Sequence, residues 1–225
     1  MLLPKTFIFL KNLSKNNNKE WFEKNRSDYE EIRENLKKNA QKLINGLEMF
    51  DEQIRYKGLQ PKNCLFRINR DVRFSNNKSP YKTNMALHFD LGSKAVSSST
   101  YYIHISPEDS FVGGGIYMPM PPELYKIRIA ISQKYKQFQS IINSKQFIKY
   151  FPNGISTHDS LKTVPRGFKE NNPAIEYLRM KGYTALCPLT NDELTNDDCF
   201  GKILEHFKAL YPLNKFLNEA VVAEV

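Results

Sequence analysis

Apolar side chains in the first quarter of the chain recur at helical spacing. Residues 5–13 predict a short helix that begins after Pro4. Beyond the asparagines at positions 16–18, apolar residues recur at intervals of three and four, or multiples of them. The positions are Phe22, Tyr29, Ile32, Leu36, Ala40, Leu43 and Leu47. This spacing predicts one long amphipathic helix with charged residues on its solvated face.

The spacing changes to alternation after position 65, which indicates strands. Apolar residues at 85, 87, 89 and 91 alternate with Asn84, Ala86, His88 and Asp90. Residues 92–100 predict a flexible connection. Residues 101–105 and 111–117 then predict two strands joined by a hairpin turn at 106–110. Three successive glycines at 113–115 favour a bulge or the close approach of another backbone.

The second half of the chain predicts mainly helices. One amphipathic helix is expected over 124–142, a short one near 144–150, and another after Pro173. Thr190 or Asn191 is expected to cap a helix that extends to about 208, and Pro212 to begin a terminal helix. Residues 153–169 predict an irregular segment with one short strand. The order of elements predicts a single α+β domain over residues 1–225, with a mainly antiparallel sheet covered by helices.

The stretch from Arg67 to Lys82 concentrates positive charge. Its basic residues are Arg67, Arg70, Arg73, Lys78 and Lys82, and its one acid is Asp71. We expect a strand at 66–74, in which Arg70 falls on the same face as the apolar residues. A charge on that face needs a bulge that turns it away, a partner such as Asp71, or an anionic ligand.

A second basic stretch runs from Leu161 to Gly182. Its cations are Lys162, Arg166, Lys169, Arg179 and Lys181. Pro165 and Gly167 flank Arg166, which indicates a backbone that presents one guanidinium. Arg179 could pair with Glu176 or with the main chain. Arginine binds carboxylate or phosphate through two parallel hydrogen bonds, so both stretches are candidate anion sites.

The net charge of the whole chain indicates which kinds of partner it could bind. A net charge of +9 suits an anionic small molecule or nucleic acid. The three cysteines lack metal-site spacing, and no apolar run approaches the length of a membrane span. With no secretory signal pattern, the sequence predicts a cytoplasmic protein that does not enter membranes. It indicates no metal site, names no cofactor and leaves the oligomeric state open.

Candidate proton-transfer groups lie on the predicted strands. His88 and Asp90 share one strand face, and His104 lies on the next strand. These groups could bind a metal, perform acid–base chemistry, or be ordinary sheet residues. The sequence contains no phosphate loop, dinucleotide fingerprint, zinc-protease motif or serine-hydrolase motif. Aromatic residues near the cations could stack on bases or fill the core.

Three hypotheses of function follow from these patterns. In the first, both basic stretches form one anion-binding cleft, which could belong to an enzyme, with Asp71, Tyr81 and His104 as candidates for proton transfer. The ligand contacts would be Arg67, Arg70, Arg73, Lys78, Lys82 and Arg166, supported by Arg128 and Arg179. The second hypothesis is a non-catalytic nucleic-acid-binding module. The third is a scaffold protein with a structural network of arginine and aspartate.

Several motifs together resemble a known family. They are Asn17 with Trp21-Phe22, the stretch 66–83, Gly113–Gly115, Leu124 with Arg128, and the stretches 161–168 and 177–181. In these motifs the chain is similar to the family known as domain of unknown function 2461, over roughly residues 5–210. Asn172 departs from the histidine that relatives tend to carry there. The resemblance implies a single domain and supports the choice of residues, and it implies no activity.

Overall fold

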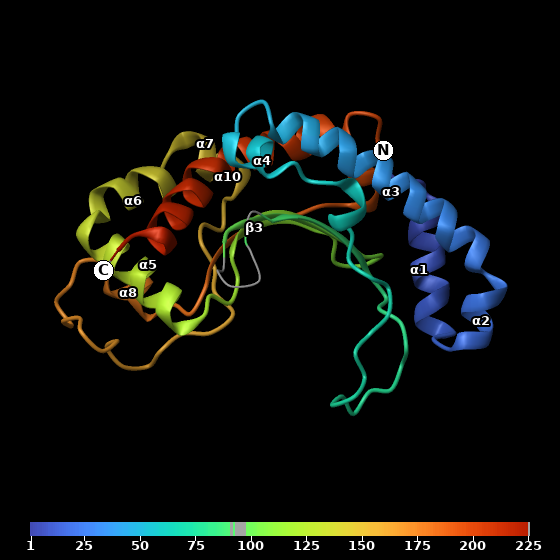
Figure 1. The fold of residues 1–225 in the computed structure, drawn as a ribbon, viewed down its shortest axis with the longest axis horizontal. Helices are drawn as coiled ribbons and strands as arrows, with labels where there is room; N and C mark the ends of the chain where they lie inside the picture. Colours follow the sequence, from blue (N-terminus) through green and yellow to red (C-terminus); the bar gives the residue numbers. More distant parts are fainter. Residues whose placement is uncertain (91, 93–97, 225) are drawn as a thin grey trace. The chain divides into compact units, whose positions relative to one another are not determined.

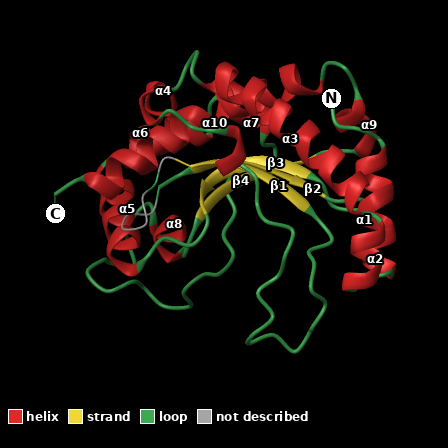
Figure 2. Ribbon diagram, turned by 45° about the vertical axis from the view of Figure 1, so that its right-hand side comes forward, coloured by secondary structure: helices red, strands yellow, loops and turns green. Residues whose placement is uncertain are grey.

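A computed structural model describes residues 1–90, 92 and 98–224 (Figure 1). The first half contains α1 (Lys5–Lys15), α2 (Lys19–Lys24), α3 (Arg26–Leu47), α4 (Glu52–Lys57), the 3-10 helix η1 (Pro61–Asn63), β1 (Met85–Asp90) and β2 (Thr100–Ile105). The second half contains β3 (Phe111–Ile116), α5 (Pro121–Gln133), α6 (Tyr135–Ile142), α7 (Lys145–Tyr150), α8 (Ile175–Arg179), β4 (Tyr183–Pro188), α9 (Asn191–Thr195) and α10 (Cys199–Val222). Figure 2 shows the strands as one sheet with helices around it. The sheet is antiparallel with the order β1-β2-β3-β4, so the predicted α+β fold is confirmed.

The strands β1, β2 and β3 and the helices α1, α7 and α8 confirm the sequence predictions. The hairpin turn between β2 and β3 is held by Ser110, whose hydroxyl accepts from the Ser106 amide at 2.9 Å and donates to the Ser106 carbonyl at 2.7 Å. The predicted connection over 92–100 lies largely outside the described residues, and its last residue begins β2.

Three predicted helices are each interrupted. The first breaks between α2 and α3 at Asn25, whose side chain donates to the Trp21 carbonyl at 2.8 Å and so competes with the helical hydrogen bonds. The second breaks at Lys134, where φ −110° and ψ 35° depart from helical values. The third breaks between α9 and α10, because Asn196 is extended. The predicted cap is confirmed, since Thr190 forms a capping box with Glu193.

Two further predictions are wrong, and one strand of the structure was not predicted. The segment 153–169 forms no strand and contributes only isolated bridges at Ser156 and Ser160. Ser156 pairs with Thr184 of β4, a strand that the sequence did not predict because its short apolar run lacks clear alternation. Pro212 does not begin a helix but lies inside α10. Buried apolar residues on both sides of Pro212 keep the helix continuous there.

The chain divides into two compact units. The first unit comprises residues 1–89, 102–112 and 188–204, and the second comprises 90–101, 113–187 and 205–225. A single domain over 1–225 therefore stays a prediction.

In the first unit, helices enclose an aromatic and aliphatic core. Phe22 of α2 packs against Phe9 and Tyr29, with ring centroids 6.3 and 5.1 Å away. Leu36 of α3 and Met85 of β1 line the same small gap, so α3 lies beside this strand. Because side chains alternate along a strand, the opposite face of β1 is available for other contacts.

In the second unit, α10 packs closely on β2 and β3. The ring of Phe207 lies 5.0 Å from that of Tyr101. A Cβ atom at Gly114 would lie 2.0 Å from the carbonyl oxygen of Thr100 and 2.6 Å from the side chain of Leu210. The predicted close backbone approach at the glycines of β3 is therefore confirmed.

Candidate functional site

The basic stretch Arg67–Lys82 is a loop, and the predicted strand at 66–74 is wrong. The two ends of the loop pair with each other, because the Arg70 amide donates to Pro80 at 2.9 Å and the Lys82 amide donates to Ile68 at 2.8 Å. Proline has no amide hydrogen, and the Ser and Asn residues between the two arms favour turns, so a ladder cannot extend. The predicted apolar face does not form: Ile68 is buried, whereas Phe74 is 97% exposed.

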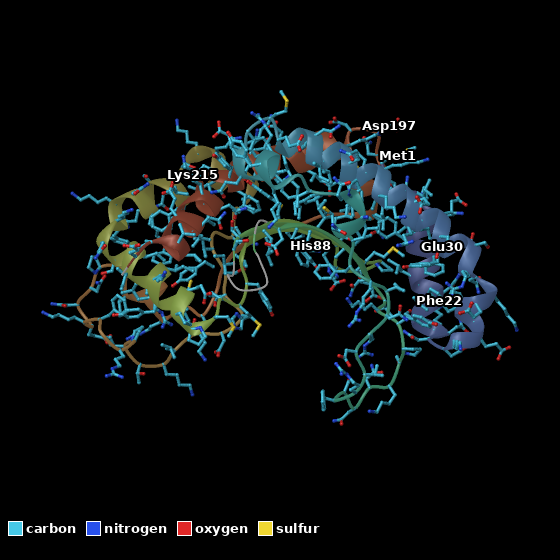
Figure 3. All side chains as sticks on the ribbon, in the orientation of Figure 1. Met1, Phe22, Glu30, His88, Asp197 and Lys215 are labelled. Atoms are coloured by element: carbon cyan, nitrogen blue, oxygen red, sulfur yellow. The ribbon has the colours of Figure 1, made fainter. Side chains whose placement is uncertain are left out.

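Contacts with α2 and the turn before it hold the end of this basic loop. Asn17 accepts from the Tyr81 amide at 3.0 Å and donates to the Tyr81 carbonyl at 2.9 Å. The Tyr81 ring stacks on Phe22, which Figure 3 labels on α2, with 4.1 Å between centroids. These contacts fix the backbone next to Lys82. The Tyr81 side chain is buried against the core, whereas a hydroxyl that transfers a proton to a ligand would be exposed to that ligand.

Beside the loop, an open pocket of about 400 Å³ lies within the first unit. Its lining residues are Phe66, Arg70, Asp71, Lys82, Asn84, Ala86, Tyr102 and His104. Four of them, Arg70, Asp71, Lys82 and His104, are among the predicted site residues. The loop and β2 therefore bring predicted cations and predicted proton-transfer groups to one place.

The carboxylate of Asp71 is already paired. It receives two hydrogen bonds from the Arg73 guanidinium, at 3.0 and 2.7 Å. These bonds, more than the nearby charge of Arg67, hold the pKa of Asp71 below its ordinary value. Pairing of Arg70 with Asp71, one of the alternatives that the sequence left open, does not form, because the turn of the loop places Arg73 against the carboxylate instead.

The guanidinium of Arg70 has only long contacts with the described residues. Its guanidinium lies 3.4 Å from the Ser79 carbonyl oxygen and 3.4 Å from the Ser75 hydroxyl. Both distances are at the outer limit for hydrogen bonds, so most of the N–H groups of the guanidinium can still donate to a ligand. The side chain is half-buried at the edge of the pocket.

Lys82 lies beside an aromatic ring rather than a carboxylate. Its ammonium nitrogen is 5.0 Å from the centroid of Phe66. Burial, and secondly the charge of Arg67, lower the pKa of Lys82. Within the described part of the chain, no carboxylate forms a salt bridge with Arg67, Arg70 or Lys82. Arg70 and Lys82 thus line the pocket without a salt bridge to a described carboxylate, and the exposed Arg67 adds its positive charge near Lys82.

His104 brings an imidazole to the same lining. Its Nδ1 lies 3.4 Å from the Tyr102 hydroxyl, and its Nε2 lies 3.9 Å from a carboxylate oxygen of Asp109. Burial lowers the pKa of His104, and Asp109 offsets this in part. Burial likewise raises the pKa of Tyr102. A neutral imidazole next to a protonated phenol can accept a proton from a bound ligand.

The other predicted cations of the loop do not line the pocket; they are Arg67, Arg73 and Lys78. Arg73 is paired with Asp71. The exposed Lys78 donates from its ammonium group to the Val72 carbonyl at 3.1 Å, which closes the tip of the loop. Arg73 and Lys78 thus shape the loop.

The predicted arginines of the second unit have local partners or solvent around them. Arg128 is almost fully buried and donates to the Met180 carbonyl at 3.0 Å. Arg179 pairs with Glu170 at 2.6 Å rather than with Glu176, one of the alternatives that the sequence left open. Arg166 is exposed. The pocket lining belongs entirely to the first unit, and a cleft shared by both basic stretches stays a prediction.

Sequence reasoning missed four lining residues: Phe66, Asn84, Ala86 and Tyr102. The alternation of side chains along a strand could have indicated three of them. It places Asn84 and Ala86 on the same face as His88, and Tyr102 on the same face as His104. Phe66 gave no such signal. It reaches the pocket because its amide donates to Ala86 at 3.2 Å and its ring lies 4.5 Å from that of His88, a residue of the sheet labelled in Figure 3.

Metal-binding and membrane-spanning features are absent from the part of the chain that the structure describes. No group of three or more His, Cys, Asp or Glu side chains in the described ranges is placed to hold a metal ion. Asp90 instead accepts from the Gly92 amide and the Ser98 hydroxyl, each at 2.7 Å. No helix among these same residues is long and apolar enough to cross a membrane.

Comparisons with known proteins place the chain in a family. A family model described as conserved hypothetical protein (DUF2461) matches residues 5–216. No curated protein and no solved structure matches the chain. Because the matched residues span most of the sequence, the chain belongs to the DUF2461 family of conserved hypothetical proteins.

Proposed function

We propose that the pocket beside the basic loop binds a phosphate-containing or other anionic ligand. The observation that carries this proposal is the pair of half-buried cations that line the pocket, Arg70 and Lys82, neither of which forms a salt bridge with a described carboxylate. A partly buried cation without a counter-ion costs free energy, and a bound anion removes that cost. The geometry of Arg70 suits this role, since its contacts are long enough to be exchanged for a ligand.

A catalytic step on such a ligand would fall to His104. Asp71 is a poor proton donor, because its pairing with Arg73 keeps it ionised. Tyr81 is buried under Phe22. His104 lines the pocket, and its lowered pKa keeps it neutral and able to accept a proton. Arginine and lysine beside it would stabilise negative charge that develops on the ligand.

The contacts of Arg70 favour ligand binding over the scaffold hypothesis. A structural arginine network would have short, paired bonds, and its loss would cost about 3–5 kcal/mol. Two contacts at 3.4 Å are worth less than about 1 kcal/mol together. The Arg70→Ala variant should therefore keep nearly all of its stability in urea unfolding while it loses ligand.

Calorimetric titration with inorganic phosphate, sulfate and ribose 5-phosphate tests the proposal. We expect binding by the wild type, weakened about 10- to 100-fold in Arg70→Ala, since a charge-assisted hydrogen bond contributes roughly 1.5–3 kcal/mol. Arg55→Ala is the matched control, because Arg55 is an exposed arginine of α4 that donates to Glu48 and does not line the pocket. Equal losses in both variants would reduce the effect to net charge and refute the pocket.

The nucleic-acid hypothesis is favoured by one observation, the exposed aromatic rings of Phe66 and Phe74 next to cations. Single strands bind to such surfaces by stacking, with strong salt dependence. Binding of oligonucleotides without binding of any small anion would support this hypothesis against the pocket.

A further inference from the structure

The cations of the pocket share it with a row of aromatic rings. Phe66, Tyr102 and His104 all line it. The ring of Phe66 lies 6.1 Å from that of Tyr102, edge to face, and Tyr102 lies 5.7 Å from Phe111. His104 stacks on Phe111 at 4.9 Å with nearly parallel planes. The polar and aromatic parts of the lining are therefore continuous.

Sheet packing accounts for part of this row but not for Phe66. Tyr102, His104 and Phe111 lie on neighbouring strands, where cross-strand ring pairs stabilise a sheet. Phe66 lies outside the strands and is 46% exposed. Single exposed apolar residues are common on protein surfaces. Phe66 differs because its ring lines the pocket and the Lys82 ammonium lies 5.0 Å from its centroid.

We propose that the ligand of this pocket is an anion joined to a planar aromatic ring, in the manner of a nucleoside monophosphate. The inference rests on the proposed anion binding at the same site. The phosphate lies against Arg70 and Lys82, and the ring stacks on Phe66. Asn84 and the Tyr102 hydroxyl, which line the same pocket, supply donors and acceptors for the polar edge of the ring.

The arrangement also sets the size of the ligand. The Lys82 ammonium lies only 5.0 Å from the Phe66 centroid, so a phosphate at Lys82 and a ring at Phe66 would belong to one compact ligand. Pockets for small ligands combine apolar walls with a few polar groups that fix orientation, and their volume is commonly about 300–1,000 Å³. The pocket of about 400 Å³ lies at the small end of that range, which suits one nucleotide.

Calorimetric titration with four matched probes tests the inference: adenosine 5′-monophosphate, ribose 5-phosphate, adenosine and inorganic phosphate. Stacking on one aromatic side chain changes affinity by about 5- to 100-fold. We therefore expect the nucleotide to bind more tightly than ribose 5-phosphate by a factor in this range. Phe66→Leu should remove that advantage without weakening ribose 5-phosphate, and Phe66→Tyr should keep it.

Phe74→Leu is the matched control. Phe74 is an exposed phenylalanine of the same loop and also lies near a cation, 5.9 Å from the Arg73 guanidinium carbon, but it does not line the pocket. Its substitution should leave nucleotide affinity unchanged within about twofold, as expected for a surface site without contacts to the ligand. Equal losses in the Phe66 and Phe74 variants would overturn the assignment of Phe66.

The outcomes separate this inference from the proposal on which it rests. If ribose 5-phosphate and the nucleotide bind equally and Phe66→Leu changes neither, the aromatic ring is overturned while the anion pocket stands. If no phosphate compound binds, the anion pocket itself fails. If only oligonucleotides bind, with a salt dependence that indicates several phosphate contacts, the single-nucleotide ligand is overturned.

Discussion

Replacing Asn17 with alanine should loosen the end of the basic loop. The Asn17 side chain forms two hydrogen bonds with the backbone of Tyr81, at 3.0 and 2.9 Å. Each is worth about 1 kcal/mol net, and a partly buried amide left without a partner adds to the loss. We expect the free energy of unfolding to fall by about 2–3 kcal/mol in Asn17→Ala, which for a chain of this size lowers Tm by roughly 4–10 °C.

Urea unfolding followed by circular dichroism measures this change. Asn16→Ala is the control, because Asn16 is exposed and its side chain bonds only locally, to the Asn12 carbonyl at 3.0 Å. Its free energy of unfolding should change by less than about 0.5 kcal/mol. Asn17→Ala should also weaken phosphate binding, since Lys82 follows Tyr81 directly. If Asn17→Ala is as stable as Asn16→Ala, the two hydrogen bonds do not hold the loop and the reasoning is refuted.

Three further predictions concern single groups. Burial places the folded-state pKa of His104 below its ordinary 6.5, so the unfolded chain takes up the proton first and the free energy of unfolding falls as pH drops below that value. The free energy of unfolding of His104→Gln should depend less on pH in that range. Because the charge of Asp109 raises the His104 pKa, NMR titration should show a still lower His104 pKa in Asp109→Asn. Gly114→Ala should destabilise the fold by about 1–3 kcal/mol or more, because the added Cβ would lie 2.0 Å from the Thr100 carbonyl oxygen. Gly201→Ala should not destabilise the fold, because the nearest atom there is the end of the flexible Asp198 side chain. Thermal unfolding of the two variants measures the difference. Burial raises the pKa of Cys64 to about 11, so iodoacetamide at neutral pH should modify it only after unfolding, and rapid modification of the native protein would contradict this burial.

The pattern of residues predicted the strands of the site better than its loop. Alternation is a local property, and it placed His88 and His104 on strands that the structure contains. The same reasoning failed at 66–74, where apolar and polar residues also alternate. Pairing between Arg70 and Pro80 overrides that alternation, because the chain reverses between them. A strand needs a partner over several residues, and the sequence around position 70 does not show that its partner is its own continuation.

The roles of Phe66 and Tyr81 depend on packing between segments that are distant in the sequence, so the sequence did not predict them. In the sequence, Phe66 is one more apolar residue. The hydrogen bond from its amide to the Ala86 carbonyl places it beside the cations. Tyr81 reads as a candidate catalytic hydroxyl, and only its stacking on Phe22 shows it as a support of the loop. Both contacts join residues that are separated in sequence, so no local pattern contains them.

Charge density overstates the number of cations that a ligand can use, because pairing removes some of them. Arg73 is bound to Asp71, and Lys78 donates to the main chain of its own loop. The sequence shows five basic residues against one acid, which leaves open which cation the acid will take. The backbone turn decides it: Arg73 lies two residues from Asp71 and donates two hydrogen bonds to its carboxylate, whereas Arg70, although adjacent, turns toward Ser75 and Ser79. The candidate site is therefore defined by the cations that the fold leaves without acids, and that selection is a property of the folded loop.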